Sequence, residues 1–470
     1  MKKLFYLLFI LFLLSILPCG CGENVNTISI PTPQGNAKIE GIVSDSEQGS
    51  PLSSAVVTIK ETGQKTTTNS EGKFSIALPG GTYTVILDKE GYGESKAQSV
   101  KVASGAATTV DMIEMPLVNP SWEKTSPVIN ISGISDGEVI DSVKNVTVNV
   151  QGNNDIKLIK FRLGNKYGDP YITVWDQSSL TTSLNPSLIP PDGTYINIYA
   201  CDENNNISEI TMVLKGSSSA IAPPSKAPDG VYAQSYTFGE APASAKGKAL
   251  LPGGKLIELS SIPTGASCFV SICWNGVENA SGYKISRATG QTGPFSPAGI
   301  TLPREQKQKE YNFTDWDPAF TKPGQTLYYQ ITPYNSGGTG PTSSTTPELT
   351  VLDVFKVNLV SPDNELVSTG PALSWSYNNP VGEKREYDVY ILEQNGSNVK
   401  TWKTTITSNS SSETSVTVPM GKLEVNTVYQ WDIDAMACGS NSEYGYLAYS
   451  SPRLDLIGAN NGRFTFTTRP

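Results

Sequence analysis

The chain contains no histidine, and this absence removes several kinds of catalytic site. Without an imidazole there is no Ser-His-Asp or Cys-His nucleophilic site, no histidine-ligated zinc and no imidazole acid–base catalysis. Carboxylate pairs, lysine Schiff bases and all-oxygen calcium sites remain formally open. Charged residues are sparse, at 17% of the chain, whereas glycine (42) and proline (32) are plentiful. This composition favours turn-rich β modules over helical bundles, whose surfaces need more Glu and Lys.

The length and the hydrophobic pattern predict a row of β domains. At about 100–150 residues per domain, 470 residues correspond to three or four domains. The 21 tyrosines argue against disorder, because disordered chains are poor in aromatic residues. Alternation of apolar and polar residues dominates the chain, and no amphipathic helix pattern follows the N-terminal segment. We therefore expect an all-β protein.

The N-terminus has the pattern of a secretory signal peptide over residues 1–20. Lys2 and Lys3 precede an apolar run over residues 4–17, and small residues follow. The run ends in Pro-Cys-Gly-Cys-Gly at residues 18–22, which resembles a bacterial lipobox. The resemblance implies that Cys21 becomes the first mature residue and carries lipid, although Pro18 stands where an aliphatic residue is usual. A plain cleaved signal peptide and an uncleaved anchor helix are the alternatives.

Charge and anchoring together indicate where the protein acts and which partners it has. Removal of residues 1–20 leaves 33 basic and 44 acidic side chains, a net charge of −11. An acidic surface repels nucleic acid and anionic lipid headgroups, so the acyl chains alone should hold the membrane. Gly22 resembles the residue that accompanies delivery to the outer membrane. We expect a lipid-anchored protein of the bacterial envelope, at the outer membrane or cell surface.

Few cysteines follow the signal segment, and none suggests a disulfide or a metal cluster. Cys268 and Cys273 lie five residues apart in one predicted strand, which puts them on opposite faces and about 16 Å apart. Cys201 and Cys438 fall in other predicted modules. We expect buried single thiols, no metal site and no cofactor.

Residues 21–36 are polar and contain proline, which predicts a flexible tether behind the lipid. The next segment, 37–115, alternates apolar residues between two turn sequences, Asn-Ser-Glu-Gly at 69–72 and Pro-Gly-Gly-Thr at 79–82. The order of these motifs, with Gly-Ile-Val at 41–43 and Gly-Tyr at 91–92, resembles the carboxypeptidase regulatory-like domain. The resemblance implies a transthyretin-like sandwich that serves as an accessory module and has no peptidase activity.

A Pro-containing linker at 116–125 leads to a second predicted module over 126–215. Its strands and its Asp/Asn/Gly turns are similar to those of bacterial Ig-like domains. The turn at residues 202–206, Asp-Glu-Asn-Asn-Asn, has two readings. Its oxygens could bind calcium. A hydrogen-bonded Asx turn explains the same residues, and the sequence lacks the alternating acidic residues of a dedicated calcium loop.

A second linker, 216–225, precedes two modules that resemble fibronectin type III domains, over 226–352 and 353–470. Trp274 and the strand with Tyr283 carry the first resemblance, and Trp375 and Trp431 belong to the second. By register, Leu327 occupies the usual tyrosine-corner position and Tyr328 points outward, so the corner hydrogen bond should be missing. Residues 238–262 form a predicted inserted hairpin or loop.

The sequence offers one main candidate for ligand binding, in a long predicted loop over 438–461. Exposed aromatic rings with a few polar groups suit stacking on a sugar or anchoring a protein. The alternative is local packing of the same rings. The candidate residues are Tyr444, Tyr446, Tyr449, Arg453 and Asp455. A weaker aromatic group at Tyr167, Tyr171 and Trp175 is interpreted as strand and core residues.

Asp315 and Asp317 form a carboxylate pair, but glycosidase acids sit across a cleft, so a structural role is the preferred interpretation. No segment is left for a catalytic domain, and we expect no enzyme activity. The predicted fold is tandem β-sandwich modules (transthyretin-like, Ig-like and two fibronectin type III-like) after a signal helix. The predicted function is display of these modules for binding extracellular carbohydrate or protein. The alternative is a structural spacer or accessory subunit of an envelope complex, with no ligand site.

Overall fold

The structure is a computed structural model, and it confirms an all-β protein built from tandem β-sandwiches. It describes residues 37–45, 50–116, 118–119, 121–164, 170–240, 247–250, 256–259, 267–301, 310–317, 319–377, 384–393, 400–408, 414–442, 445–453 and 464–470. The predicted signal helix and tether lie outside these ranges. Across the described ranges, helical structure is limited to the 3-10 turn η1 (Pro186–Leu188), and no helix has the length and hydropathy to span a bilayer.

Module 1 (37–115) consists of seven strands in two facing sheets. Its strands are β1 (Ala37–Asp45), β2 (Val56–Ile59), β3 (Lys65–Thr67), β4 (Lys73–Leu78), β5 (Gly81–Asp88), β6 (Ser95–Val102) and β7 (Ala107–Met115). One sheet has the order β4-β1-β7, and the other contains β3-β2-β5-β6. The alternating residues Phe74, Ile76 and Leu78 of β4 are buried, as their spacing predicts for one face of a strand.

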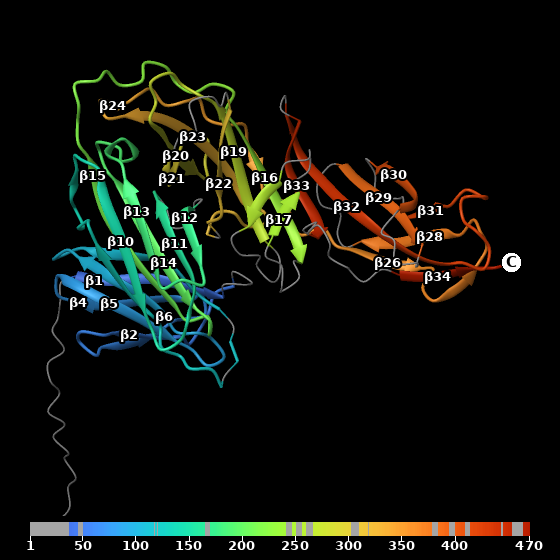
Figure 1. The fold of residues 1–470 in the computed structure, drawn as a ribbon, viewed down its shortest axis with the longest axis horizontal. Helices are drawn as coiled ribbons and strands as arrows, with labels where there is room; N and C mark the ends of the chain where they lie inside the picture. The colour runs from blue at the N-terminus through green and yellow to red at the C-terminus, as the bar shows by residue number, and fades with distance from the viewer. Residues whose placement is uncertain are drawn as a thin grey trace, which may run out of the picture.

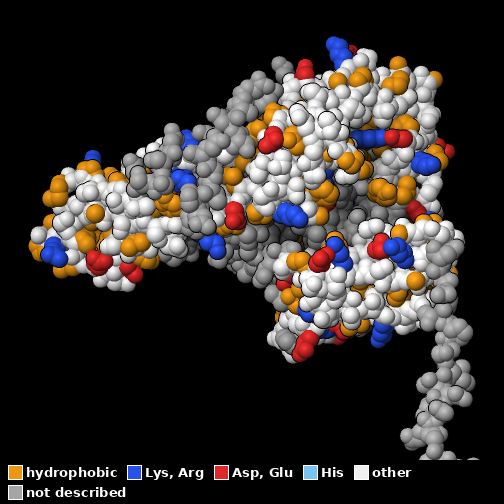
Figure 2. Space-filling view, turned by 180° about the vertical axis from the view of Figure 1, so that it is seen from behind, with side chains coloured by type: hydrophobic (Ala, Val, Ile, Leu, Met, Phe, Trp, Pro, Cys, Tyr) orange, Lys and Arg blue, Asp and Glu red, His pale blue; other side chains and the backbone are white. Residues whose placement is uncertain are grey.

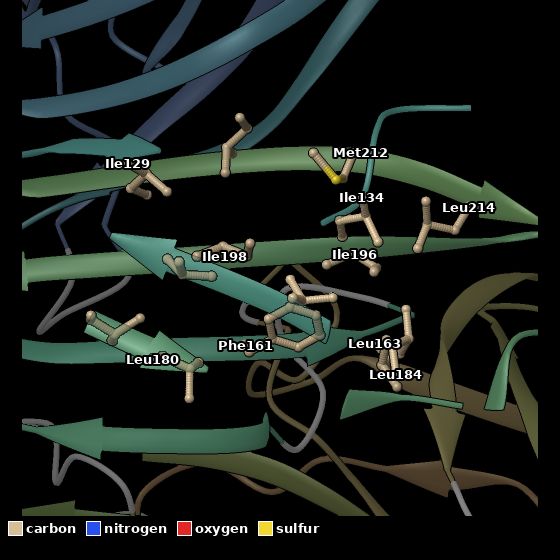
Figure 3. Packing of buried hydrophobic residues seen from close by; sticks show 14 of the residues in the cluster. Ile129, Ile134, Phe161, Leu163, Leu180, Leu184, Ile196, Ile198, Met212 and Leu214 are labelled. Atoms are coloured by element: carbon tan, nitrogen blue, oxygen red, sulfur yellow. The ribbon is translucent and has the colours of Figure 1, made fainter. Parts of the chain in front are cut away.

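Module 2 (126–215) repeats the two-sheet plan. Its strands are β8 (Val128–Ser132), β9 (Val139–Ile140), β10 (Lys144–Gln151), β11 (Ile156–Leu163), β12 (Pro170–Trp175), β13 (Ser179–Leu184), β14 (Thr194–Asp202) and β15 (Ile207–Gly216). The three-stranded sheet β13-β10-β8 faces the sheet β12-β11-β14-β15. Figure 3 shows Leu184 of the first sheet beside Leu163 of the second, and both belong to the core between the sheets, with Leu180, Phe161 and Ile198.

Module 3 (226–352) packs around the fully buried Trp274. Its strands are β16 (Tyr232–Glu240), β17 (Gly247–Leu250), β18 (Leu256–Leu259), β19 (Ser267–Asn275), β20 (Gly282–Ala288), β21 (Ser296–Thr301), β22 (Glu310–Asp315), β23 (Thr326–Asn335), β24 (Gly338–Thr339) and β25 (Leu349–Thr350). β17 and β18 pair as an antiparallel hairpin, so the predicted insertion is a hairpin. Leu327 lies in the core, and the Tyr328 hydroxyl donates to the Glu348 carboxylate (2.8 Å) instead of to a corner carbonyl.

Module 4 (353–470) packs around Trp431, whose ring nitrogen donates to the Pro362 carbonyl (2.8 Å). Its strands are β26 (Val357–Ser361), β27 (Glu365–Val367), β28 (Ala372–Tyr377), β29 (Lys384–Glu393), β30 (Lys400–Ser408), β31 (Ser415–Thr417), β32 (Val428–Ser442), β33 (Gly445–Arg453) and β34 (Phe464–Thr468). Here a tyrosine corner is present, because the Tyr429 hydroxyl accepts from the Glu424 amide (2.9 Å).

Continuous sheets cross two of the three module boundaries. In one nine-stranded sheet β15 of module 2 pairs in parallel with β6 of module 1, and in another β16 of module 3 pairs in parallel with β33 of module 4. Figure 1 shows modules 1 and 2 stacked at one end, module 3 beside them, and module 4 extending away with the C-terminus at its far end. Figure 2 shows acidic and basic side chains interspersed over the face in view.

The four cysteines of the described modules are free. Cys201, Cys273 and Cys438 are buried, and Cys268 is half-buried. Burial raises the pKa of the Cys201, Cys268 and Cys438 thiols to about 11. These thiols therefore behave as small hydrophobic groups, as the spacing argument predicted.

Candidate functional site

The segment predicted as a long loop over 438–461 is largely an extension of the sheet. β32 continues to Ser442, and β33 returns antiparallel to it from Gly445 to Arg453. The loop prediction is therefore wrong for these residues. The physical reason is that β33 has a second neighbour, β16 of module 3, which the local sequence of module 4 does not reveal.

β33 also contributes to the core of the neighbouring module. Leu447 and Ala448 are buried among the core residues of module 3. Because successive side chains of a strand point to opposite faces, Tyr449 lies on the face opposite Ala448. Its ring is half-buried and stacks on the Tyr236 ring of β16 at 5.3 Å between centroids and 8° between planes.

Tyr449 ends a row of four aromatic rings that crosses the boundary between modules 3 and 4. Tyr236 stacks on Phe269 at 5.2 Å, and Phe269 contacts Trp316 at 4.4 Å. Tyr236 and Phe269 are almost fully buried. This row links strands β33, β16, β19 and the end of β22, and stacked pairs of this kind add about 0.5–1.5 kcal/mol each beyond their buried area.

The structure describes only part of the predicted ligand-binding group. Tyr446 and Arg453 lie in β33, so neither belongs to a free loop. Tyr444 and Asp455 are outside the described residues, and so is the predicted lipidation site, Cys21. Of the five candidates, the described side chain of Tyr449 packs against module 3. Its ligand-binding role stays a prediction.

Asp315 and Asp317 are held by a buried arginine that the sequence analysis did not single out. Arg287 of β20 donates to both Asp315 oxygens (2.7 and 2.8 Å) and to Asp317, and the phenol of Tyr329 donates to Asp315 (3.0 Å). The guanidinium also lies 3.8 Å from the Phe320 ring centroid. All of these charged groups are at most 5% exposed, so the network lies inside module 3.

The electrostatics of this network are unbalanced, because one guanidinium faces two carboxylates. Burial raises the pKa of Asp317 above its ordinary value, and Arg287 counters part of that rise. Burial and the neighbouring Asp315 also raise the pKa of Tyr329. The carboxylates bond to protein groups inside the sandwich, which suits a structural role and not acid–base work across a cleft.

The turn at residues 202–206 is held by hydrogen bonds to the Asp202 carboxylate, and it joins modules 1 and 2. The Asp202 carboxylate accepts from the Asn206 amide (2.7 Å), the Asn206 side chain (2.9 Å) and the Asn154 side chain (3.0 Å). The Asn206 side chain also accepts from the Glu94 amide of module 1 and donates to the Glu123 carbonyl of the linker. These N–H donors bond to both carboxylate oxygens of Asp202 and to the side-chain oxygen of Asn206, which are two of the groups that the calcium reading would have used. No group of three or more potential metal ligands occurs among the described residues.

Modules 2 and 3 share side chains as well. Ile300 of β21 belongs to the core of module 2, and the Tyr334 hydroxyl donates to the Leu188 carbonyl (2.8 Å). The predicted linker 216–225 is bonded to module 3, since Ser219 donates to the Ser336 carbonyl (2.8 Å).

In the second aromatic group of the sequence analysis, Tyr171 and Trp175 pack in two different hydrophobic clusters. Tyr171 packs against the core of module 2, 6.2 Å from Phe161, as expected. Trp175 packs on Leu158 and Cys201 on the opposite side of the sheet. Tyr167 lies outside the described residues.

The residues that build these junctions escaped the sequence analysis for a common reason. Tyr236 and Ile300 sit at ordinary strand positions, and their partners lie in other modules; Arg287, inside module 3, was missed for the same reason. A charged residue in a predicted strand, as at Arg287, was the one available signal, because a charge that becomes buried needs a partner.

Comparison with known proteins supports the domain assignment of module 1. Residues 38–115 match the family model of the carboxypeptidase regulatory-like domain. This match covers one module of the chain, and regulatory-like and sandwich modules of this type are typically non-catalytic. No curated protein matches the chain.

Three solved structures are similar to parts of the chain. The FN1–FN3 domains of chicken CNTN1 are 16% identical, with a TM-score of 0.31, and the alignment covers 73% of this chain and 99% of that one. A DUF3823 family protein from Bacteroides ovatus is 12% identical (TM-score 0.17; 38% and 98% covered). Dimeric latent PorU from Porphyromonas gingivalis is 11% identical (TM-score 0.18; 76% and 35% covered). The assignment to tandem β-sandwich proteins rests on the sheets themselves.

Proposed function

We propose that this protein is a non-enzymatic lipoprotein of the bacterial envelope whose four modules form one stiff arm. The arm holds β-sandwich surfaces away from the membrane, where they bind extracellular carbohydrate or protein. The observation that carries the proposal is the continuity of the sheets across module boundaries, at β6–β15 and at β16–β33.

The junctions between modules 1 and 2 and between modules 3 and 4 combine backbone pairing with shared side chains, and modules 2 and 3 meet through side chains. A net contribution of about 0.5–1.5 kcal/mol per hydrogen bond makes several paired residues at a boundary costly to separate. The Asp202–Asn206 clamp, Ile300 and Leu447 add buried contacts at the three successive boundaries. A chain of modules on free linkers would have none of these contacts.

The N-terminal sequence supports the anchor. The apolar run of residues 4–17 and the cysteine at position 21 would place the lipid before the tether and module 1, with module 4 farthest from the membrane. A spacer without a ligand site is the second candidate. The burial of Tyr236 beneath Tyr449 favours it, because that ring pair holds two modules together.

Pulsed spin-label distance measurements test the stiff arm. Nitroxides at Lys65→Cys in module 1 and Thr407→Cys in module 4, both exposed positions, should give one narrow distance distribution. Leu447→Ala, which removes a core contact at the boundary between modules 3 and 4, should broaden it. A broad distribution in the parent protein would overturn the stiff-arm proposal. Labelling with radioactive palmitate, lost in Cys21→Ser, tests the anchor.

A further inference from the structure

The outer face of the three-stranded sheet β13-β10-β8 in module 2 carries no charged side chain. Leu180, Leu184 and Ile129 of these strands face the core, so the alternate residues face outward (Figure 3). Ten side chains make up this surface, here called the neutral face: Val128, Asn130, Ser132, Asn145, Thr147, Asn149, Gln151, Ser179, Thr181 and Ser183. Thr147 is half-buried, and the other nine are exposed.

The strand register arranges the neutral face as a grid. Thr181, Thr147 and Ser132 form one row across the three strands, and Ser179, Asn149 and Asn130 form the next. Rows of this kind repeat about every 6.6–6.8 Å along the strands, and the strands lie about 4.8 Å apart. Bonds within the grid, such as Thr147 to Thr181 (3.2 Å), hold side chains in place.

The composition of the neutral face is not what a stable exposed sheet needs. Asparagine is depleted in strands, and an ordinary surface is about a quarter to a third charged. Charges on the outer strands would also protect the sheet from pairing with other chains. Departures of this kind from the local rules concentrate at functional surfaces.

The same contrast appears twice in the molecule. In module 2 the outer side of the opposite sheet carries Lys160, which is buried, and the half-buried Arg162 and Glu209. In module 4 the pair Lys403–Asp388 lies on the outer side of β29 and β30. The three-stranded sheet β26-β28-β31 of module 4 is again neutral. Its outward residues are Asn358, Val360, Ala372, Ser374, Ser376, Ser415 and Thr417.

The chemistry of the neutral face matches one class of ligand. Ser, Thr, Asn and Gln side chains both donate and accept hydrogen bonds, as sugar hydroxyls do. A charged glycan would lack an ion partner here, and a protein partner would lack the aromatic or apolar centre that protein interfaces use. A single sugar would reach few of the ten side chains, whereas a polymer lying on the sheet would reach most of them.

We propose that the neutral faces of modules 2 and 4 bind an extended, uncharged polysaccharide. This inference rests on the binding role in the proposed function, and it moves the site from β33 to the flat faces of the three-stranded sheets. It depends neither on the lipid anchor nor on the stiffness of the arm.

Co-sedimentation with insoluble polysaccharides tests the proposal. The chain from residue 22 onward is mixed with cellulose, chitin or insoluble β-1,3-glucan, with gel-immobilised polygalacturonate as the acidic comparison. One variant places lysines on the face of module 2 (Asn149→Lys with Thr181→Lys). A second does so on module 4 (Ser376→Lys with Thr417→Lys), and a third combines both. The matched control, Thr401→Lys with Thr407→Lys, adds the same charge to exposed positions of β30.

We expect the parent chain to sediment with at least one neutral polymer, each single-face variant to bind about 10-fold more weakly, and the combined variant to lose binding. The control should bind like the parent, and all four variants should keep the parent's circular dichroism. Equal binding by the combined variant, or binding by the parent to polygalacturonate alone, would overturn the proposal. Failure of the parent chain to bind any neutral polymer would also overturn the proposal. The spin-label distances test the stiff-arm proposal independently of that result.

Discussion

Replacing Arg287 by methionine should destabilise module 3 strongly at neutral pH. Methionine keeps much of the side-chain length and can still contact the Phe320 ring, so the change removes mainly the guanidinium. Its loss leaves Asp315 and Asp317 buried beside each other without a cation. Removing one partner of a buried ion pair typically costs about 3–5 kcal/mol. We expect a loss in that range at pH 7.

The loss of stability in Arg287→Met should become smaller as the pH falls. The direction of this pH dependence follows from the raised pKa of Asp317. Burial raises the pKa of Asp317 above 3.8, so the folded protein binds a proton more tightly than the unfolded chain does. A raised carboxyl pKa contributes stability that is fully present below the unfolded pKa and is lost as the pH rises through the folded value. Without Arg287 the folded value rises further, so the variant loses most stability at neutral pH and recovers part of it in acid.

Urea unfolding followed by tryptophan fluorescence measures both effects, because Trp274 and Trp316 lie in module 3. Asp317→Asn is the matched control. It removes the excess negative charge, leaves Asp315 bonded to Arg287, and should change the free energy of unfolding by about 1 kcal/mol or less at pH 7. A loss below about 1 kcal/mol for Arg287→Met, or a loss that grows toward acid, would refute the reasoning.

Three further predictions concern the junctions and the thiols. Ile300→Ala should lower the stability of module 2 by about 2–4 kcal/mol although residue 300 belongs to module 3, and calorimetry that left the module 2 transition unchanged would contradict this. Asn206→Ala should cost about 1–3 kcal/mol and separate the unfolding of modules 1 and 2, whereas a single unchanged transition would count against the clamp. Cys438, with its pKa raised to about 11, should react with a thiol reagent at pH 8 at the rate of unfolding, and fast reaction in the folded protein would show that the thiol is accessible.

The sequence predicts the contents of each module well, because those contents follow from local periodicity. The alternation at Phe74, Ile76 and Leu78 identifies a half-buried strand without knowledge of its partner. Turn residues then separate one strand from the next, and the buried tryptophans mark the centres of the last two sandwiches. The same alternation identifies part of the neutral face, because Thr147 and Asn149 are the polar residues of the run Val-Thr-Val-Asn-Val at 146–150. The lack of charge on this face becomes visible only when β8, β10 and β13 lie side by side.

The junctions could not be predicted in the same way, because a strand's second neighbour leaves little mark on its own residues. β33 contains the apolar run Tyr-Leu-Ala-Tyr at 446–449, which from the sequence alone is equally compatible with a strand and with a loop that buries its own rings. What decides between them is the exposed edge of β16, about 200 residues earlier in the chain. The unpaired edge of a sheet can pair with strands of other chains and so promote aggregation. Here β33 of module 4 covers the edge of β16 in module 3. The same residues therefore cover the edge of β16, contribute to the core of module 3 and bury Tyr236, and the ligand-binding role expected for this segment stays a prediction.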